Sequence, residues 1–174
     1  MKFTLLTHEK EFAKRSNTGR VVLEVLGSAA EQVHWDRMNP PATLLEEIEA
    51  GGVALVYPGA VDEQDGDLAG INHFILIDGT WHEARKIHQR SPYLQKVRRV
   101  NLTPTGMSRY TLRKNQKEAC LCTAECVIAI LRSTGNDAAA DLLEESFLAF
   151  ISQSGAKAAK LKVPDDSPAL PVCG

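Results

Sequence analysis

Two patterns of apolar residues recur along the chain, and together they predict most of its secondary structure. Short continuous apolar runs predict strands over residues 3–7, 53–57, 74–77 and 99–102. Helical spacing, together with residues that start and stop helices, predicts helices over 21–26, 43–50, 81–90, 123–131 and 137–151. Continuous apolar strands separated by helices are typical of an α/β fold. The pattern therefore predicts a mostly parallel sheet that is flanked by helices and buried on both faces.

The chain has the size and composition of one globular domain. It has 174 residues, of which 44% are hydrophobic and 24% charged, and no internal repeat. We expect a single catalytic domain over residues 1–152 and a loosely ordered tail over 153–174, where Ser, Gly, Ala, Lys and Pro dominate. No apolar run reaches the roughly 18 residues of a membrane span, and the first residues lack the apolar centre of a secretory signal. We expect a cytoplasmic, monomeric protein.

Charge is distributed unevenly along the chain. The net charge is −2, yet residues 84–117 hold ten Lys or Arg residues and no Asp or Glu. Such a block of one sign attracts a phosphate backbone, and Tyr93 and Tyr110 within it could stack on unpaired bases. A solvated basic face without a partner is the alternative interpretation.

Three of the predicted strands end in segments that could share one pocket. They end at Tyr57-Pro58-Gly59, at Asp78-Gly79-Thr80-Trp81, and just after Leu102. In open α/β sheets, ligands bind beyond the carboxyl ends of the strands. Two ordinary tight turns would give the same pattern at the first two positions.

Asp78 is the strongest candidate for catalysis. It closes an apolar run, so its carboxylate should lie at a strand end rather than on open surface. At a strand end it could remove a proton from a bound substrate. The alternative is that Asp78 only caps the helix that follows. The segment also resembles a phosphatase motif, but Leu76 stands where that motif needs its nucleophile, which excludes phosphatase chemistry.

Three of the four cysteines, Cys120, Cys122 and Cys126, lie within seven residues. Their spacing matches none of the usual zinc sets, and no histidine lies near them in the sequence. We interpret them as structural thiols and expect no metal.

Five blocks in order resemble the DTW-domain family of tRNA-uridine aminocarboxypropyltransferases, over about residues 4–150. The blocks are Ser16-Asn17-Thr18-Gly19-Arg20, Val56-Tyr57-Pro58-Gly59, Asp78-Gly79-Thr80-Trp81 with Ala84-Arg85-Lys86 and Ser91-Pro92, Ser108-Arg109-Tyr110 with Leu112-Arg113-Lys114, and Thr123 with Glu125. Members often carry a cysteine cluster ahead of the first strand. This chain lacks it, which suggests a shortened member.

The resemblance implies a fold akin to the SPOUT class, with a trefoil knot that holds S-adenosylmethionine. It also implies that the aminocarboxypropyl group of this donor is moved to N3 of a tRNA uridine, with Asp78 as the base. The implied cofactor-binding residues are Tyr57, Pro58, Gly59, Gly79, Thr80, Trp81, Leu102, Thr123 and Glu125. The implied tRNA-binding residues are Arg15, Asn17, Thr18, Arg20, Arg85, Lys86, Arg90, Arg109, Arg113 and Lys114. The alternatives are a methyltransferase on the same fold, an RNA-binding module without catalysis, and an anion-binding α/β protein.

Overall fold

The computed structural model describes residues 1–12, 14, 16–57, 68–102 and 121–160, and of residues 154–160 only the backbone. Its centre is a five-stranded sheet in the order β2-β1-β4-β3-β5, in which every neighbouring pair is parallel. The strands are β1 (Lys2–Thr7), β2 (Ala30–His34), β3 (Val53–Val56), β4 (His73–Asp78) and β5 (Arg98–Val100). The predicted α/β class and parallel sheet are confirmed.

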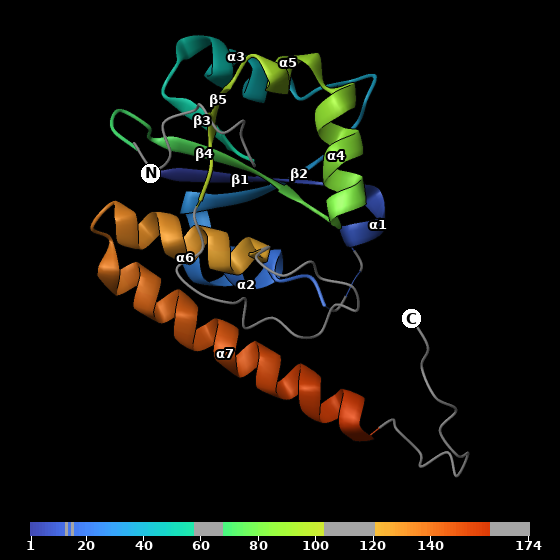
Figure 1. Ribbon diagram of the computed structural model, residues 1–174, viewed down its shortest axis with the longest axis vertical. Helices are drawn as coiled ribbons and strands as arrows, with labels where there is room; N and C mark the ends of the chain where they lie inside the picture. Colours follow the sequence, from blue (N-terminus) through green and yellow to red (C-terminus); the bar gives the residue numbers. More distant parts are fainter. Residues whose placement is uncertain (13, 15, 58–67, 103–120, 161–174) are drawn as a thin grey trace, which may run out of the picture.

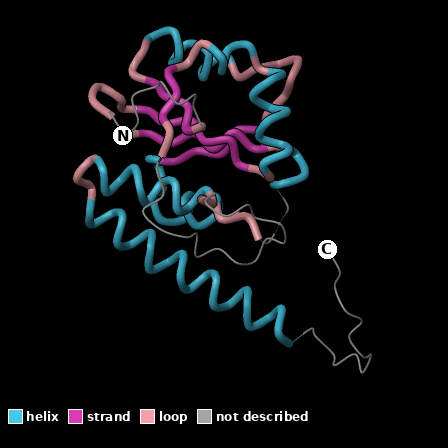
Figure 2. Tube along the Cα trace, in the orientation of Figure 1, coloured by secondary structure: helices cyan, strands magenta, loops and turns pink. Residues whose placement is uncertain are grey.

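Helices cover both faces of the sheet, in three layers that Figure 2 separates by colour. As Figure 1 shows, α2, α6 and α7 lie on one face, and α3, α4 and α5 on the other. Helical segments are α1 (Glu9–Phe12), α2 (Gly19–Leu26), η1 (Gly27–Ala29), α3 (Ala42–Ala50), α4 (Trp81–Arg90), α5 (Pro92–Gln95), α6 (Thr123–Ser133) and α7 (Asp137–Lys160).

The apolar strands feed two separate cores. In β4, Phe74 and Leu76 join the core under α2, α6 and α7, whereas Ile75 joins the core under α3, α4 and α5. Adjacent side chains of a strand point to opposite faces, so a strand that is buried on both sides is mostly apolar. This explains why continuous apolar runs, rather than alternating ones, marked β1, β3 and β4.

Strand β2 was not predicted, and its sequence shows why. Its residues, Ala30-Glu31-Gln32-Val33-His34, form the edge of the sheet next to β1, and none of them is fully buried. An edge strand that is half exposed needs no apolar run, so its pattern is hard to distinguish from a loop.

The last helix is longer than predicted. Helix α7 continues to Lys160, nine residues past the predicted end at Ile151, and so enters the segment expected to be a loose tail. Residues 161–174 lie outside the described part of the chain. The predicted trefoil knot depends on residues 58–67 and 103–120, which also lie outside it, so the knot stays a prediction.

Strands β1 and β4 lie side by side, and the chain leaves their carboxyl ends toward opposite faces. Thr7 of β1 is the register partner of Asp78 of β4. After β1 the chain passes through the short helix α1 and then reaches α2 on one face, whereas after β4 it goes on to α4 on the other face. In α/β proteins, ligands bind beyond the carboxyl edge of the sheet, at the point where neighbouring connections leave toward opposite faces.

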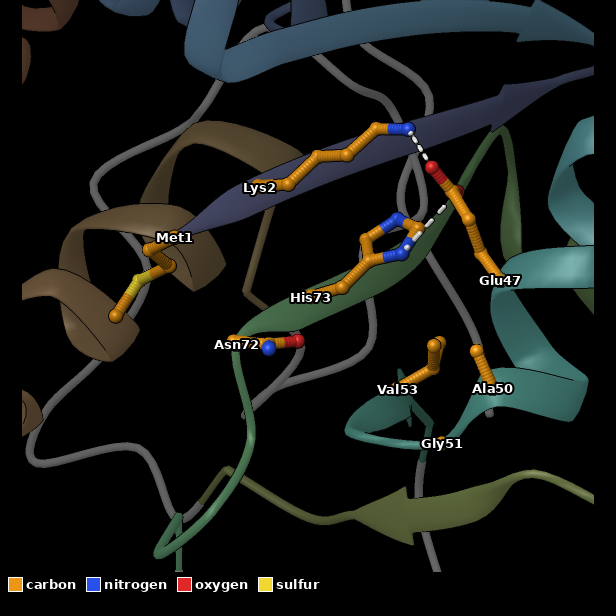
Figure 3. A pocket seen from close by; sticks show the side chains of 8 residues that line it. All are labelled: Met1, Lys2, Glu47, Ala50, Gly51, Val53, Asn72 and His73. Carbon is orange, nitrogen blue, oxygen red and sulfur yellow. Dashed lines mark hydrogen bonds and ion pairs between the residues drawn. The ribbon is translucent and has the colours of Figure 1, made fainter.

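The opposite, amino edge of the sheet holds a network of ionisable groups around a cavity of about 380 Å³ (Figure 3). Lys2 pairs with Glu47 at 2.5 Å and with Glu31 at 3.1 Å. His73 is only 4% exposed, and its Nε2 lies 2.8 Å from the Thr4 hydroxyl. Its Nδ1 lies 3.4 Å from Glu47.

Burial lowers the pKa of His73 below its ordinary value of 6.5, although Glu47 acts in the opposite direction. The folded protein therefore binds a proton at His73 less readily than the unfolded chain does. The contribution of His73 to the free energy of unfolding is fully present above pH 6.5. This contribution is lost as the pH falls from 6.5 toward the lowered pKa of the folded state.

We expect His73→Gln, which can still hydrogen-bond to Thr4, to flatten the decline of unfolding free energy below pH 6.5. The measurement is urea unfolding at a series of pH values. His34→Gln is the matched control because His34 is exposed. An equal pH dependence in both variants would contradict the role given to His73.

Candidate active site at the carboxyl edge of the sheet

Asp78 is the centre of the site at the carboxyl edge. It is completely buried, and three side chains from separate segments donate hydrogen bonds to its carboxylate. Asn17 Nδ2 lies 2.7 Å and Thr7 Oγ1 3.4 Å from Oδ2, and Thr123 Oγ1 lies 2.8 Å from Oδ1. The alternative that Asp78 caps the next helix is wrong, because Thr80 is the N-cap of α4.

The segment before α2 is shaped around this carboxylate. The side-chain oxygen of Asn17 accepts the backbone N–H of Gly19 at 2.7 Å, and its amide also donates to the carbonyl of Glu11 at 3.2 Å. A Cβ at Gly19 would lie 3.0 Å from both Asn17 Oδ1 and Asp78 Oδ2. A side chain at position 19 would therefore force Asn17 or Asp78 to shift by a few tenths of an ångström.

The turn after Asp78 is fixed by a capping box. The Thr80 backbone N–H and hydroxyl donate to Glu83 Oε2 at 2.8 and 2.7 Å, and the Glu83 N–H donates to the Thr80 hydroxyl at 3.3 Å. Burial alone would raise the pKa of Glu83, but these hydrogen bonds outweigh it and lower the pKa to about 2. Glu83 is therefore ionised at all ordinary pH values and holds the turn.

Three rings stack beside the turn. Tyr57, just after β3, lies 5.6 Å from Trp81 and 4.3 Å from His88 between ring centroids, nearly parallel to both. Burial and the charge of Arg99 lower the pKa of His88, so its ring is neutral at pH 7. Trp81 is 42% exposed and thus presents an aromatic surface that Tyr57 supports.

Helix α6 begins at the same edge. Its first residue, Thr123, is the one that donates to Asp78, and Glu125 accepts the backbone N–H of Cys122 at 2.8 Å. Cys122 is buried, and burial raises the pKa of its thiol, as expected for a structural cysteine. Leu102 is partly buried against the core below α6.

The predicted RNA-binding residues fall into two groups. Arg20, Arg85, Lys86 and Arg90 are exposed, so they are accessible to a large partner. Asn17 and Thr18 are instead 0% and 2% exposed. The structure thus gives Asn17 a place behind the catalytic candidate rather than on a surface that RNA can touch.

Several predicted site residues lie outside the described part of the chain: Pro58, Gly59, Arg15, Arg109, Arg113 and Lys114. Cys120 does too. Among the residues that are described, no three His, Cys, Asp or Glu side chains gather to hold a metal ion. In the same residues, no helix is long and apolar enough to cross a membrane.

Sequence reasoning missed Thr7, Gly19 and Glu83. Thr7 ends β1 as Asp78 ends β4, so the rule that parallel strands meet at one edge would have found it. The spacing from Thr80 to Glu83 is a capping-box signature that was also available. The contact between Gly19 and Asp78 spans 59 positions and leaves no local signal.

The chain matches a protein family over most of its length and individual known proteins over about half of it. A family model described as the DTW domain matches residues 1–154. The tRNA-uridine aminocarboxypropyltransferase 2 of Drosophila melanogaster is 35% identical over 99 residues, which cover 53% of this chain and 39% of the relative. The protein of the same name from Macaca fascicularis is 30% identical over 91 residues, 46% of this chain and 28% of the relative. The match thus spans well under half of these relatives, and no solved structure matches the chain.

We expect Gly19→Ala to destabilise the protein by about 1–3 kcal/mol through overpacking against Asn17 and Asp78. Helix propensity alone predicts the opposite sign, a gain of roughly 0.5–1 kcal/mol. Urea unfolding measures the difference. Glu24→Ala, at an exposed position of α2, controls for changes in propensity. A stabilised Gly19→Ala protein would show that the close approach to Asp78 is not a constraint.

Proposed function

The chain belongs to the DTW-domain family, and on that premise we propose that it transfers the 3-amino-3-carboxypropyl group of S-adenosylmethionine to N3 of a tRNA uridine, with methylthioadenosine as the second product. The curated relatives carry the name of this activity. The structural observation that carries the proposal is the buried Asp78 carboxylate at the carboxyl edge of the sheet, where β4 lies beside β1. A hydrogen bond joins this carboxylate to the first residue of α6.

The described residues fit a nucleoside donor at this edge. The exposed ring of Trp81, supported by Tyr57 and His88, offers a stacking surface for an adenine. Thr123 and Leu102 add a hydroxyl and an apolar contact within the same edge, and Pro58 and Gly59 belong to the proposed set. Tyr57, Gly79, Thr80 and Glu125 would act by shaping this surface.

The polar side chains there would position the reactants. When bound, the sulfonium donor supplies an electrophilic carbon and a neutral thioether leaving group. N3 of uridine carries a weakly acidic proton, so a new N–C bond at this atom requires that the protein accept that proton.

Asp78 is the final acceptor in this proposal, and Thr123 is the connection to the substrate. Because the Asp78 carboxylate is completely buried, the uridine proton would pass to the hydroxyl oxygen of Thr123 while the hydroxyl proton passes to Asp78 Oδ1, 2.8 Å away. Asn17 and Thr7 donate to the other oxygen and hold the carboxylate in place. Positioning of this kind can supply several kcal/mol of the rate acceleration.

The tRNA side of the proposal rests on charge. Arg20, Arg85, Lys86 and Arg90 are exposed and would contact phosphates, as would Arg15, Arg109, Arg113 and Lys114. Ten basic residues without a carboxylate in residues 84–117 provide the field that attracts the RNA.

The direct test is mass spectrometry of nucleosides from tRNA incubated with the protein and S-adenosylmethionine. The expected result is uridine heavier by an aminocarboxypropyl group. If the product is a methylated uridine, the protein is a methyltransferase and the proposed transfer is wrong. The substrate is tRNA that does not yet carry the modification. If its nucleosides are unchanged after incubation, the proposed catalysis is contradicted.

We expect Asp78→Asn to lose most turnover, because an amide cannot accept the proton, while the donor still binds. Calorimetry with S-adenosylmethionine and the nucleoside assay measure the two properties separately. A fully active Asp78→Asn enzyme would remove Asp78 as the proton acceptor.

We expect Thr123→Val to lower turnover about 10–100-fold, since a hydrogen bond to a charged group is worth roughly 1.5–3 kcal/mol. Thr123→Ser is the matched control, because it keeps the hydroxyl, and should retain turnover within a few-fold. Equal turnover in both would exclude the Thr123 hydroxyl from the proton path.

A further inference from the structure

A second cleft opens beside Asp78, on the face of the sheet that α4 covers. Its volume is about 220 Å³. The residues that line it come from the segments that follow β1, β2 and β4: His8, Lys10, Trp35, His82, Glu83, Lys86 and Arg90. His8 directly follows Thr7, which donates to Asp78, and His82 lies four positions after Asp78. The cleft therefore adjoins the candidate active site.

The charge of the cleft is predominantly positive. Lys10, Lys86 and Arg90 have no ion-pair partner among the residues that the structure describes. The single carboxylate in the lining, Glu83, is occupied by the Thr80 backbone and hydroxyl. Three unpaired cations around one concave surface repel one another, and an anion would relieve that repulsion.

One wall of the cleft is aromatic and fixed. Trp35 Nε1 donates to the hydroxyl of buried Ser91 at 2.9 Å, which anchors the indole. The His8 ring stacks on Trp35 with 5.9 Å between ring centroids. His8 Nδ1 accepts the Lys10 backbone N–H at 3.3 Å, so the remaining ring nitrogen can donate to an anion.

We propose that this cleft binds one backbone phosphate of the RNA, next to the nucleotide that is modified, with Lys10, Lys86 and Arg90 on the phosphate and the Trp35–His8 wall against the adjoining sugar or base. The inference rests on the proposed function, because it takes RNA as the source of the phosphate. It assigns binding roles to His8, Lys10 and Trp35.

The test compares two exposed lysines by RNA binding over a salt series. Lys10 lines the cleft, whereas Lys96 belongs to the basic segment but does not line it. We expect Lys10→Gln to weaken tRNA binding and to reduce the slope of log Kd against log salt by about 1, the value for one lost phosphate contact. Lys96→Gln should change the slope less. Equal slopes for the two variants would overturn the cleft and leave only a general basic field.

A second measurement locates the phosphate. Single methylphosphonates, which remove the charge of one phosphate, are placed in turn along a substrate RNA stem-loop. At one position next to the target uridine, the substitution should weaken binding to the unaltered protein more than it weakens binding to Lys10→Gln, in which Lys86 and Arg90 still contact the phosphate. If no position distinguishes the two proteins, the cleft does not hold an RNA phosphate.

Competition with inorganic phosphate tests whether the cleft binds a free phosphate ion instead of an RNA phosphate. The expected result is that millimolar phosphate competes with RNA at the cleft only weakly. If phosphate binds tightly and RNA binding does not depend on Lys10, the cleft is a site for the free anion and the proposal is overturned.

The binding experiments do not require group transfer. A protein that binds RNA through Lys10 but leaves uridine unmodified would contradict the proposed function and support the cleft. A protein that modifies tRNA with no dependence on Lys10 would do the reverse.

Discussion

The geometry of this site depends on one buried carboxylate. Asp78 receives hydrogen bonds from Thr7 at the end of β1, Asn17 before α2 and Thr123 at the start of α6. A buried charge is costly unless it is hydrogen-bonded, so the folded state requires these three donors. The same bonds tie the sheet to the helical layer that contains α2 and α6.

This constraint explains features that would otherwise be separate. Gly19 is required because α2 starts against the carboxylate. Asn17 serves two neighbours at once, since its amide donates to Asp78 while its oxygen orders the first turn of α2. The turn that follows Asp78 needs its own cap, Thr80, because Asp78 is already occupied. The sequence blocks that contain Asn17, Asp78 and Thr123 thus become parts of a single hydrogen-bonded unit.

The sequence predicted the parts of the fold that are encoded locally. The apolar runs located β1, β3 and β4, and helical spacing located α4 with both of its ends. The position of Asp78 at a strand end followed from the same runs. Strand β2 and the short helix α5 were missed, because an edge strand and a single turn of helix bury too few side chains to leave a pattern.

The site was less predictable than the fold, because its contacts join distant residues. Asn17 and Asp78 are 61 positions apart, and their pairing requires that α2 start beside the end of β4. The resemblance to the DTW-domain family implied an RNA-binding role for Asn17, whereas the structure buries this residue behind the carboxylate. Polar residues in a motif can either touch a ligand or hold the residue that does, and only the fold distinguishes these roles.

The two edges of the sheet show how this chain separates stability from binding. At the amino edge, Lys2 forms ion pairs with Glu31 and Glu47, so the charges there are paired within the protein and support the fold. At the carboxyl edge, Lys10, Lys86 and Arg90 surround a cleft without such partners in the described part of the chain. Unpaired cations that repel one another do not stabilise a fold, and their cost is offset only when an anion binds. Because the buried carboxylate is tied to protein donors and the cations are left open, the same edge can hold a proton acceptor and attract a polyanion without the two neutralising each other.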